Sequence, residues 1–258
     1  MLSSVEQMRL KIQTKLGSGF DILVYEKLDS TNTFLKTLVE QGKNDNTIII
    51  AYEQSGGRGT QGRKFFSPRN GLYMSMLLPN AGIVKSSMIT VVTAVAVVDA
   101  IRDVLRVDCG IKWVNDIIYQ GKKVGGILTE GEYDTGNGKL KYAIVGVGLN
   151  LQLPNTGFDK EIQDVAGALL DEIDDETYSN LVAQIIKNSY AMYSMLEDKK
   201  YIKKYQEYSV LNKKTINYIQ NGQKKCGIVA GVDEEARLIV YQNGEEIRLC
   251  AGEVSILK

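Results

Sequence analysis

A short segment rich in glycine and arginine constrains this chain more than any other feature. It runs from Gln54 to Phe65 and reads QSGGRGTQGRKF. Glycine lets backbone N–H groups come close to a ligand, and arginine neutralises a phosphate or a carboxylate. Gly57, Gly59 and Gly62 also have the G-x-G-x-x-G spacing of a dinucleotide-binding loop. On its own, the segment is equally compatible with a ligand-binding loop and with an exposed loop whose charge is incidental.

The flanking sequence excludes the two best-known phosphate-binding loops. An apolar run at 47–52 predicts the strand that precedes a Rossmann loop, but a proline and an Asn-Gly pair at 68–71 stand where its helix would open. A P-loop needs Lys-Ser or Lys-Thr after the last glycine, and the chain has Arg63-Lys64. Residues 72–78 predict a second strand. We therefore expect an exposed cationic loop between two strands.

The composition restricts the chemistry that is available. The chain has no histidine, which excludes Ser-His-Asp and Cys-His catalysis and His-ligated zinc. Lys+Arg and Asp+Glu both number 31, and this balance argues against a broad surface for nucleic acid or membranes. Cys109, Cys226 and Cys250 lie far apart without metal-ligand spacing, as expected for reduced thiols in a cytoplasmic protein.

No segment predicts targeting or membrane insertion. Residues 1–16 alternate charged and apolar residues and lack the apolar core of a signal peptide. The most apolar run, residues 88–98, is too short to span a bilayer and is flanked by charged residues. We expect this run to form a buried helix.

The hydrophobic periodicity predicts an α/β (α+β) domain with a mixed central sheet and helices. Cap-forming residues at 29–32 precede an apolar helical face, so a helix should begin there. Further helices are expected over about 84–107 and through much of 160–208, and further strands at 110–113, 116–119, 123–132 and 142–151.

The pattern changes after Leu211. Residues 214–258 alternate in short runs, with turn sequences at 221–222, 233–234 and 243–244. These hairpin signals predict a small β-barrel appended to the α/β domain. We place the boundary between 1–210 and 211–258.

Five motifs along the chain occur together and in a fixed order. They are Ser30-Thr31-Asn32, Gly57-Arg58-Gly59, Lys112-Trp113-Val114-Asn115-Asp116, Lys123-Val124-Gly125-Gly126-Ile127-Leu128 and Gly146-Val147-Gly148-Leu149-Asn150. From about Tyr25 to the end, the chain resembles biotin protein ligase, also called biotin–[acetyl-CoA-carboxylase] ligase. The resemblance implies a class II synthetase-like catalytic domain that binds biotin and ATP at 1–210, and an SH3-like barrel at 211–258.

That family's reaction has two steps. Biotin and ATP, with Mg²⁺, give biotinyl-5′-AMP and pyrophosphate, and a lysine of a biotin carboxyl carrier protein then attacks the mixed anhydride. The first step brings a carboxylate against a triphosphate. Arg58, Arg63, Lys123 and Mg²⁺ would offset this repulsion, and no histidine is required.

The resemblance implies a role for each site residue. Ser30, Thr31 and Gln54 would hydrogen-bond the ureido head of biotin. The biotin-binding set comprises Ser30, Thr31, Asn32, Gln54, Gly57, Arg58, Gly59, Thr60, Lys123, Gly125, Gly126 and Gly146. The ATP-binding set comprises Arg63, Phe65, Asn115, Lys123 and Asn150. Lys123, Arg58 and Asp116 would be catalytic, with Asp116 either holding Mg²⁺ or helping to deprotonate the incoming lysine.

Each motif also has a plain structural explanation. Helix capping accounts for Ser30, a bulge for the Gly125-Gly126 pair, and an Asx turn for Asn115-Asp116. Lys123 alone is compatible with a solvated strand residue, and Phe65 with a core aromatic. The binding roles are favoured because the motifs occur together.

The chain departs from the family pattern at two positions. Thr60 stands where the family usually has a second arginine after Gly-Arg-Gly, and Val114 stands where it usually has proline. Loss of a guanidinium predicts weaker retention of the adenylate. Loss of the proline should matter less, because proline contributes rigidity rather than charge.

Several alternatives follow from the same residues. About one helix precedes residue 29, too little for the winged helix-turn-helix of some family members, so DNA binding is disfavoured. A lipoate or octanoate transferase shares the broader fold but carries a histidine-containing element that this chain lacks. A catalytically silent biotin sensor is the other alternative. Family members often pair through the sheet, so a homodimer stays open, and composition does not decide it.

Overall fold

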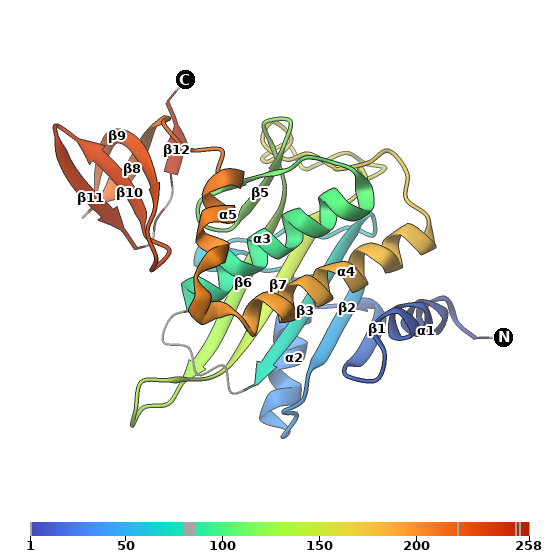
Figure 1. The fold of residues 1–258 in the computed structure, drawn as a ribbon. Helices are drawn as coiled ribbons and strands as arrows, with labels where there is room; N and C mark the ends of the chain where they lie inside the picture. Colours follow the sequence, from blue (N-terminus) through green and yellow to red (C-terminus); the bar gives the residue numbers. More distant parts are fainter. Residues whose placement is uncertain (1, 80–85, 221, 251, 253, 258) are drawn as a thin grey trace.

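The computed structural model describes residues 2–79, 86–220, 222–250, 252 and 254–257 (Figure 1). Its larger sheet has seven strands in the order β1-β2-β3-β7-β6-β5-β4. Strands β1 and β2 pair in parallel and all other neighbours are antiparallel, which confirms the predicted mixed sheet. The bounds are β1 Asp21–Leu28, β2 Thr47–Gln54, β3 Gly71–Pro79, β4 Gly110–Lys112, β5 Asp116–Tyr119, β6 Lys122–Tyr133 and β7 Leu140–Asn150.

Helices cover both faces of this sheet. Figure 1 shows α3 (Ser86–Leu105) and α4 (Asp175–Tyr193) side by side across one face, with α2 (Thr31–Glu40) on the other. The pleat of β2 explains its continuous run of isoleucines, because Ile48 and Ile50 pack into the large core on one face while Ile49 packs with Leu35 of α2 on the other. The remaining helices are α1 (Ser4–Leu16) and α5 (Lys200–Tyr208).

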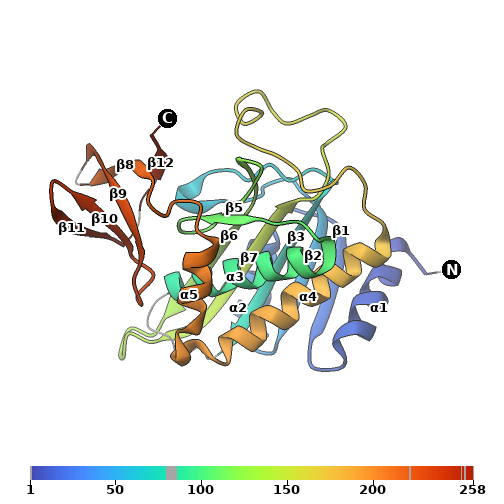
Figure 2. The same cartoon turned by 45° about the horizontal axis from the view of Figure 1, so that its top comes forward.

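The helix predicted from residue 160 is wrong over its first part. Residues 151–174 contain turns and isolated bridges, and α4 begins only at Asp175, where Asp174 Oδ1 accepts from the N–H of Thr177 at 2.6 Å. The apolar spacing had suggested a helix, but Val165 is 60% exposed. The backbone here pairs with distant strands instead: Lys123 N–H donates to Val165 O at 2.7 Å and Gly167 N–H to Lys123 O at 2.9 Å. Figure 2 shows this long loop beside β5 and β6.

The C-terminal residues form a second, antiparallel sheet in the order β11-β10-β9-β8-β12. Asn243 and Gly244 have φ values of 51° and 84°, as the predicted hairpin requires, whereas Asn221 lies outside the described residues. Among the residues that the structure covers, no pairing joins the outer strands β11 and β12. The sheet confirms a small β domain, and the boundary at 210 stays a prediction. The bounds are β8 Thr215–Gln220, β9 Gln223–Val232, β10 Leu238–Gln242, β11 Glu245–Leu249 and β12 Val254–Ile256.

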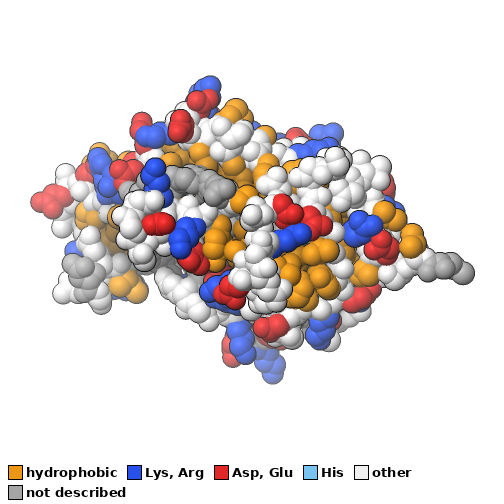
Figure 3. Space-filling model, turned by 90° about the horizontal axis from the view of Figure 1, so that it is seen from below, with side chains coloured by type: hydrophobic (Ala, Val, Ile, Leu, Met, Phe, Trp, Pro, Cys, Tyr) orange, Lys and Arg blue, Asp and Glu red, His pale blue; other side chains and the backbone are white. Residues whose placement is uncertain are grey.

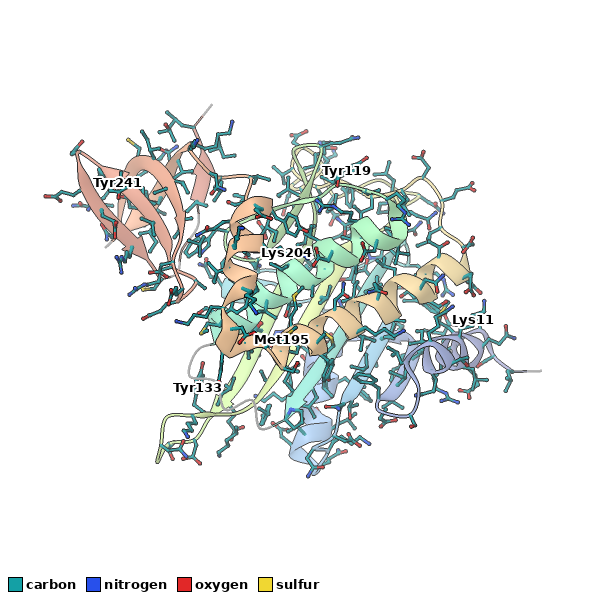
Figure 4. The ribbon with its side chains drawn as sticks, viewed as in Figure 1. Lys11, Tyr119, Tyr133, Met195, Lys204 and Tyr241 are labelled. Atoms are coloured by element: carbon teal, nitrogen blue, oxygen red, sulfur yellow. The ribbon has the colours of Figure 1, made fainter. Side chains whose placement is uncertain are left out.

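The C-terminal sheet contacts the larger domain through the segment between β4 and β5. The indole N–H of Trp113 donates to Ala236 O at 2.9 Å, and the hydroxyl of Tyr205 on α5 donates to Val114 O at 3.1 Å. Helix α5 is itself tied to α3, because Lys204 Nζ lies 2.5 Å from Asp99 Oδ2 (Figure 4). The segment that carries Asn115 and Asp116 is therefore held by contacts from the C-terminal domain and from α5.

The surface matches the balanced composition. On the face shown in Figure 3, side chains of both charge signs are interspersed with hydrophobic ones. Within the described parts of the chain, no helix combines the length and apolarity that crossing a membrane requires.

We expect the three cysteines to differ in reactivity. Cys109 is buried, and burial raises the pKa of its thiol to about 12, while Cys226 and Cys250 are exposed. The thiolate is the reactive form, so almost none exists at Cys109 near pH 8. An aromatic disulfide reagent at pH 8 should modify two thiols in the native protein and three after denaturation. Rapid modification of all three in the native protein would contradict the buried placement of Cys109.

Candidate active site

The N-terminus of α2 supplies one wall of a cleft. Ser30 is the N-cap residue, and Ser30, Thr31 and Asn32 are all buried. The Ser30 hydroxyl accepts from Thr33 N–H at 3.5 Å, so it caps the helix and lines the cleft at once. Capping therefore leaves the predicted binding role of Ser30 open.

Gln54, at the end of β2, fixes the orientation of Thr31. The Gln54 side-chain oxygen accepts from the Thr31 N–H at 2.9 Å and from its hydroxyl at 3.2 Å. The Gln54 amide nitrogen donates to Ser67 Oγ at 3.0 Å, and the Ser67 hydroxyl donates to Phe65 O at 2.9 Å. These bonds tie both ends of the glycine-rich segment to the wall of the cleft.

Asn32 has a fixed orientation as well. Its Oδ1 lies 2.6 Å from Ser75 Oγ, so the hydroxyl donates and the Asn32 amide nitrogen faces the other way. That nitrogen donates to Glu130 Oε2 at 2.8 Å. Neither Ser75 nor Glu130 was a predicted site residue, because they contact Asn32 of α2 from strands β3 and β6, which are distant from it in sequence.

Two glycines of β7 form the floor. Gly146 and Gly148 share one face of the strand, since they are two residues apart. A Cβ at Gly146 would overlap the side chain of Asn32, and one at Gly148 would lie 2.7 Å from the ring of Phe65. The glycines therefore leave room for the two side chains that rest on them. Phe65 also packs edge-on against Tyr73, with ring centroids 6.3 Å apart.

The glycine-rich segment folds as a small hairpin over the cleft. Gly59 N–H donates to Arg63 O at 2.7 Å, and Phe65 N–H donates to Gly57 O at 2.9 Å. Arg58 extends from this hairpin, and its Nη2 lies 2.7 Å from Glu130 Oε1. The predicted cationic loop between strands β2 and β3 is confirmed.

A second cation stands on the opposite side. Lys123 Nζ lies 2.5 Å from Asp116 Oδ1. The Asn115 amide nitrogen donates to Ile127 O at 3.1 Å, and Ile127 N–H donates back to Asn115 O at 3.0 Å. These paired bonds hold the β4–β5 segment against β6, so the lysine and the carboxylate have a rigid base.

Most predicted site residues meet in this one cleft, whose empty volume is about 480 Å³ including its open mouth. The predicted residues that line it are Ser30, Thr31, Asn32, Gln54, Arg58, Gly59, Thr60, Phe65, Asn115, Lys123, Gly126 and Gly146. Lining residues that sequence reasoning missed are Met74, Ile127, Leu128, Val147 and Gly148. Four of the missed residues directly follow predicted ones on β6 and β7, whereas Met74 lies on β3, which carries no predicted site residue.

Five predicted residues do not line the cleft. Gly57 packs under Ser67 and Phe65 carbonyl, and Gly125 packs against Leu149 of β7. Asp116 forms an ion pair with Lys123. The side-chain amide of Asn150 donates to Gly167 O at 3.0 Å, and the guanidinium of Arg63 donates to Gln61 Oε1 at 3.4 Å. No group of three or more metal-binding side chains was found among the described residues. Asp116 by itself could supply one carboxylate ligand, which suits a Mg²⁺ held mainly by substrate phosphates.

The cleft offers one uncharged polar end, an apolar middle and two cationic side chains. Such an arrangement fits a long ligand with a polar neutral head, an apolar stem and an anionic end. Residues 24–150 match the family model described as the biotin/lipoate A/B protein ligase family. This segment, about half of the chain, belongs to that family. The cleft-lining residues, from Ser30 to Gly148, all lie inside the matched segment.

Two named relatives show how much of the chain is similar to known proteins. The chain is similar to the bifunctional ligase/repressor BirA of Bacillus subtilis, with 32% identity over 168 residues covering 64% of this chain and 51% of that protein. It is also similar to the biotin--[acetyl-CoA-carboxylase] ligase of Mycobacterium tuberculosis, with 26% identity over 260 residues covering 94% and 91% of the two chains. The chain spans about half the length of the Bacillus relatives that it matches.

Solved structures share the fold. The biotin protein ligase from Aquifex aeolicus in complex with biotin and ATP gives a TM-score of 0.76 at 24% identity, covering 92% of this chain and 99% of that one. The biotin protein ligase from Leishmania major in complex with biotinyl-5-AMP gives 0.57 at 22% identity, covering 92% and 98%. Both likenesses cover 92% of this chain, and they support the predicted fold class.

Proposed function

We propose that this protein activates biotin with ATP as biotinyl-5′-AMP and transfers the biotinyl group to a lysine of a biotin carboxyl carrier protein. One observation carries the proposal: a single cleft joins the neutral hydrogen-bonding wall of Thr31 and Gln54 to Arg58 and Lys123. A ureido head suits the first end, and a carboxylate beside a phosphate suits the second. The names of the relatives agree with this assignment.

The residues present supply what the first step requires. A biotin carboxylate oxygen attacks the α-phosphorus of ATP, the bond from that phosphorus to the bridging oxygen breaks, and pyrophosphate leaves. Arg58 and Lys123 would lower the repulsion between the two anions and stabilise the charge that develops on the phosphoryl oxygens. Mg²⁺, if held by the ATP phosphates together with Asp116, would supply further charge neutralisation.

The second step needs a neutral amine. The lysine nitrogen of the carrier attacks the acyl carbon, the bond to the AMP oxygen breaks, and the amine loses a proton. Asp116 is the carboxylate beside Lys123, and we propose that it assists this proton transfer or holds the metal. Asn150 and Arg63 would contact the nucleotide, as the resemblance implies.

The half-reaction tests this proposal. The protein is mixed with biotin, ATP and Mg²⁺ without a carrier, and biotinyl-5′-AMP is measured by mass spectrometry. Lipoate replaces biotin in a parallel reaction, because the family name covers both acids. Biotinyl-5′-AMP with little lipoyl-AMP is the expected result. Biotin binding without adenylate would favour the silent sensor, and preferential use of lipoate would reassign the substrate.

Thr60 gives a prediction about retention of the intermediate. Its side chain lines the cleft at the start of a single turn, Thr60–Gly62, close to Arg58. We expect Thr60→Arg to slow release of biotinyl-5′-AMP about tenfold, since a charge-assisted hydrogen bond contributes ~1.5–3 kcal/mol. Release is measured in a single turnover followed by rapid filtration. Thr60→Gln, which lengthens the side chain without charge, is the control, and an equal effect of both variants would refute the charge argument.

A further inference from the structure

We propose that Glu130 is a positioning residue that holds the guanidinium of Arg58 over the cleft before the ligand arrives. This inference rests on the proposed function, because it concerns how the cleft is prepared for an anionic ligand. Glu130 lies on β6, beyond the Lys123–Leu128 motif, and it does not line the cleft. It belongs to none of the sets of residues that were expected to bind biotin or ATP.

Both oxygens of the Glu130 carboxylate are occupied. Oε1 lies 2.7 Å from Arg58 Nη2, and Oε2 accepts from Asn32 Nδ2 at 2.8 Å. The Asn32 amide is held in turn by the buried Ser75 hydroxyl at 2.6 Å. The carboxylate is therefore oriented from the interior, and it presents a fixed oxygen to Arg58.

This fixed oxygen matters because the pair is partly exposed. The side chains of Arg58 and Glu130 are 49% and 35% exposed, and an isolated ion pair at such a surface contributes little to stability. The entropy lost in ordering two long side chains offsets most of the favourable free energy of an ion pair. Here the hydrogen bond from Asn32 has already ordered the side chain of Glu130. Glu130 is thus suited to placing Arg58 rather than to stabilising the fold.

The pairing leaves Arg58 able to bind a ligand. Among the described contacts, only Nη2 of Arg58 has a side-chain partner, so Nε and Nη1 can still donate. The hairpin carrying Arg58 is otherwise closed by its own backbone bonds, such as Gly59 N–H to Arg63 O. Glu130 links this hairpin to a central strand of the sheet, since β6 pairs on both sides with β5 and β7.

The carboxylate of Glu130 has a second potential effect, which is to weaken the binding of an anionic ligand. If Glu130 competed with the ligand for Arg58, its removal would strengthen anion binding. The free Nε and Nη1 edge favours the positioning role, because the ligand need not displace Glu130. The sign of the change in ligand affinity therefore decides between placement and competition.

The first test uses the ligand-free protein. Hydrogen–deuterium exchange is measured over residues 55–65 in the wild type, Glu130→Ala, Glu130→Gln and the control Glu132→Ala. Glu132 lies two residues along the same strand and pairs with Lys141 at 3.2 Å, outside the cleft. We expect the backbone amides of the hairpin to exchange about threefold faster, or more, in both Glu130 variants than in the wild type. The exchange rate in the Glu132→Ala control should equal that of the wild type. Unchanged exchange in both Glu130 variants would overturn the inference.

The second test measures coupling. The KM for biotin in adenylate formation is determined for Glu130→Ala, Arg58→Ala and the double variant. We expect Glu130→Ala to raise KM about five- to tenfold, with a smaller effect on kcat, and to have almost no further effect once Arg58 is absent. Additive effects would show that Glu130 acts through Asn32 alone, and a lowered KM would show competition. Either result overturns the positioning role.

The two tests separate this inference from the proposed function. A wild-type protein that forms no biotinyl-5′-AMP contradicts the proposed function. The exchange measurement needs no ligand, so it still decides whether Glu130 places the Arg58 hairpin.

Discussion

Replacement of Lys123 by alanine should lower the rate of biotinyl-5′-AMP formation by about 10²–10³-fold. The ammonium group stands at the cleft beside Asp116, with Nζ 2.5 Å from Oδ1. In the proposed reaction, its removal takes away one of the two cations that would offset the repulsion between the biotin carboxylate and the α-phosphate. It also leaves the carboxylate of Asp116 unpaired next to the cleft, which would add repulsion toward the phosphates. The loss should fall mainly on kcat, because the charge develops during phosphoryl transfer.

Matched variants separate charge from packing. Lys123→Met keeps most of the side-chain length without the charge, so it should be as impaired as Lys123→Ala. Lys122→Ala removes the neighbouring, exposed lysine, whose Nζ lies 3.4 Å from Gln163 O outside the cleft, and it should keep near wild-type activity. Rates come from quenched-flow mass spectrometry of the adenylate. Near-normal activity of Lys123→Met would remove Lys123 from the proposed catalytic group.

Local sequence signals predicted the elements that position the site. The capping sequence before Thr31 marked the start of α2, and the apolar runs around the Gly-Arg-Gly loop marked β2 and β3. The signals for these elements lie within short stretches of sequence, which is why periodicity and turn chemistry were sufficient to predict them. The resemblance then gathered Lys123 and Gly146 into one cleft, as the structure shows.

Long-range pairing set the limit of sequence reasoning. Residues 160–174 carry helix-like apolar spacing, but their backbone groups bond to Lys123 and Asn150 on strands β6 and β7. Glu130 was missed for a related reason, because its partners Arg58 and Asn32 lie 72 and 98 residues away. No local pattern encodes contacts of this separation, and they appear only when the sheet order is known.

A methyl group at Gly146 should damage the biotin end of the cleft as severely as the loss of Lys123 damages the phosphate end. The Cβ of Gly146→Ala would overlap the side chain of Asn32 on the floor of the cleft. Asn32 would have to move, and its bonds to Ser75 and Glu130 would break. We expect the KM for biotin to rise ~10²-fold, the order of loss that a 1 Å misplacement produces. Overpacking should also cost about 1–3 kcal/mol of unfolding free energy, measured by urea denaturation.

The control is a glycine-to-alanine change in open space. At the exposed Gly19 a new Cβ meets no atom within 4 Å, so Gly19→Ala should leave KM and stability near their wild-type values. A second comparison identifies the cause. Asn32→Ala removes the side chain that the methyl group would meet, so Gly146→Ala should add little to the KM of that variant. If the two changes instead raise KM independently, the methyl group acts by filling the cleft rather than by displacing Asn32.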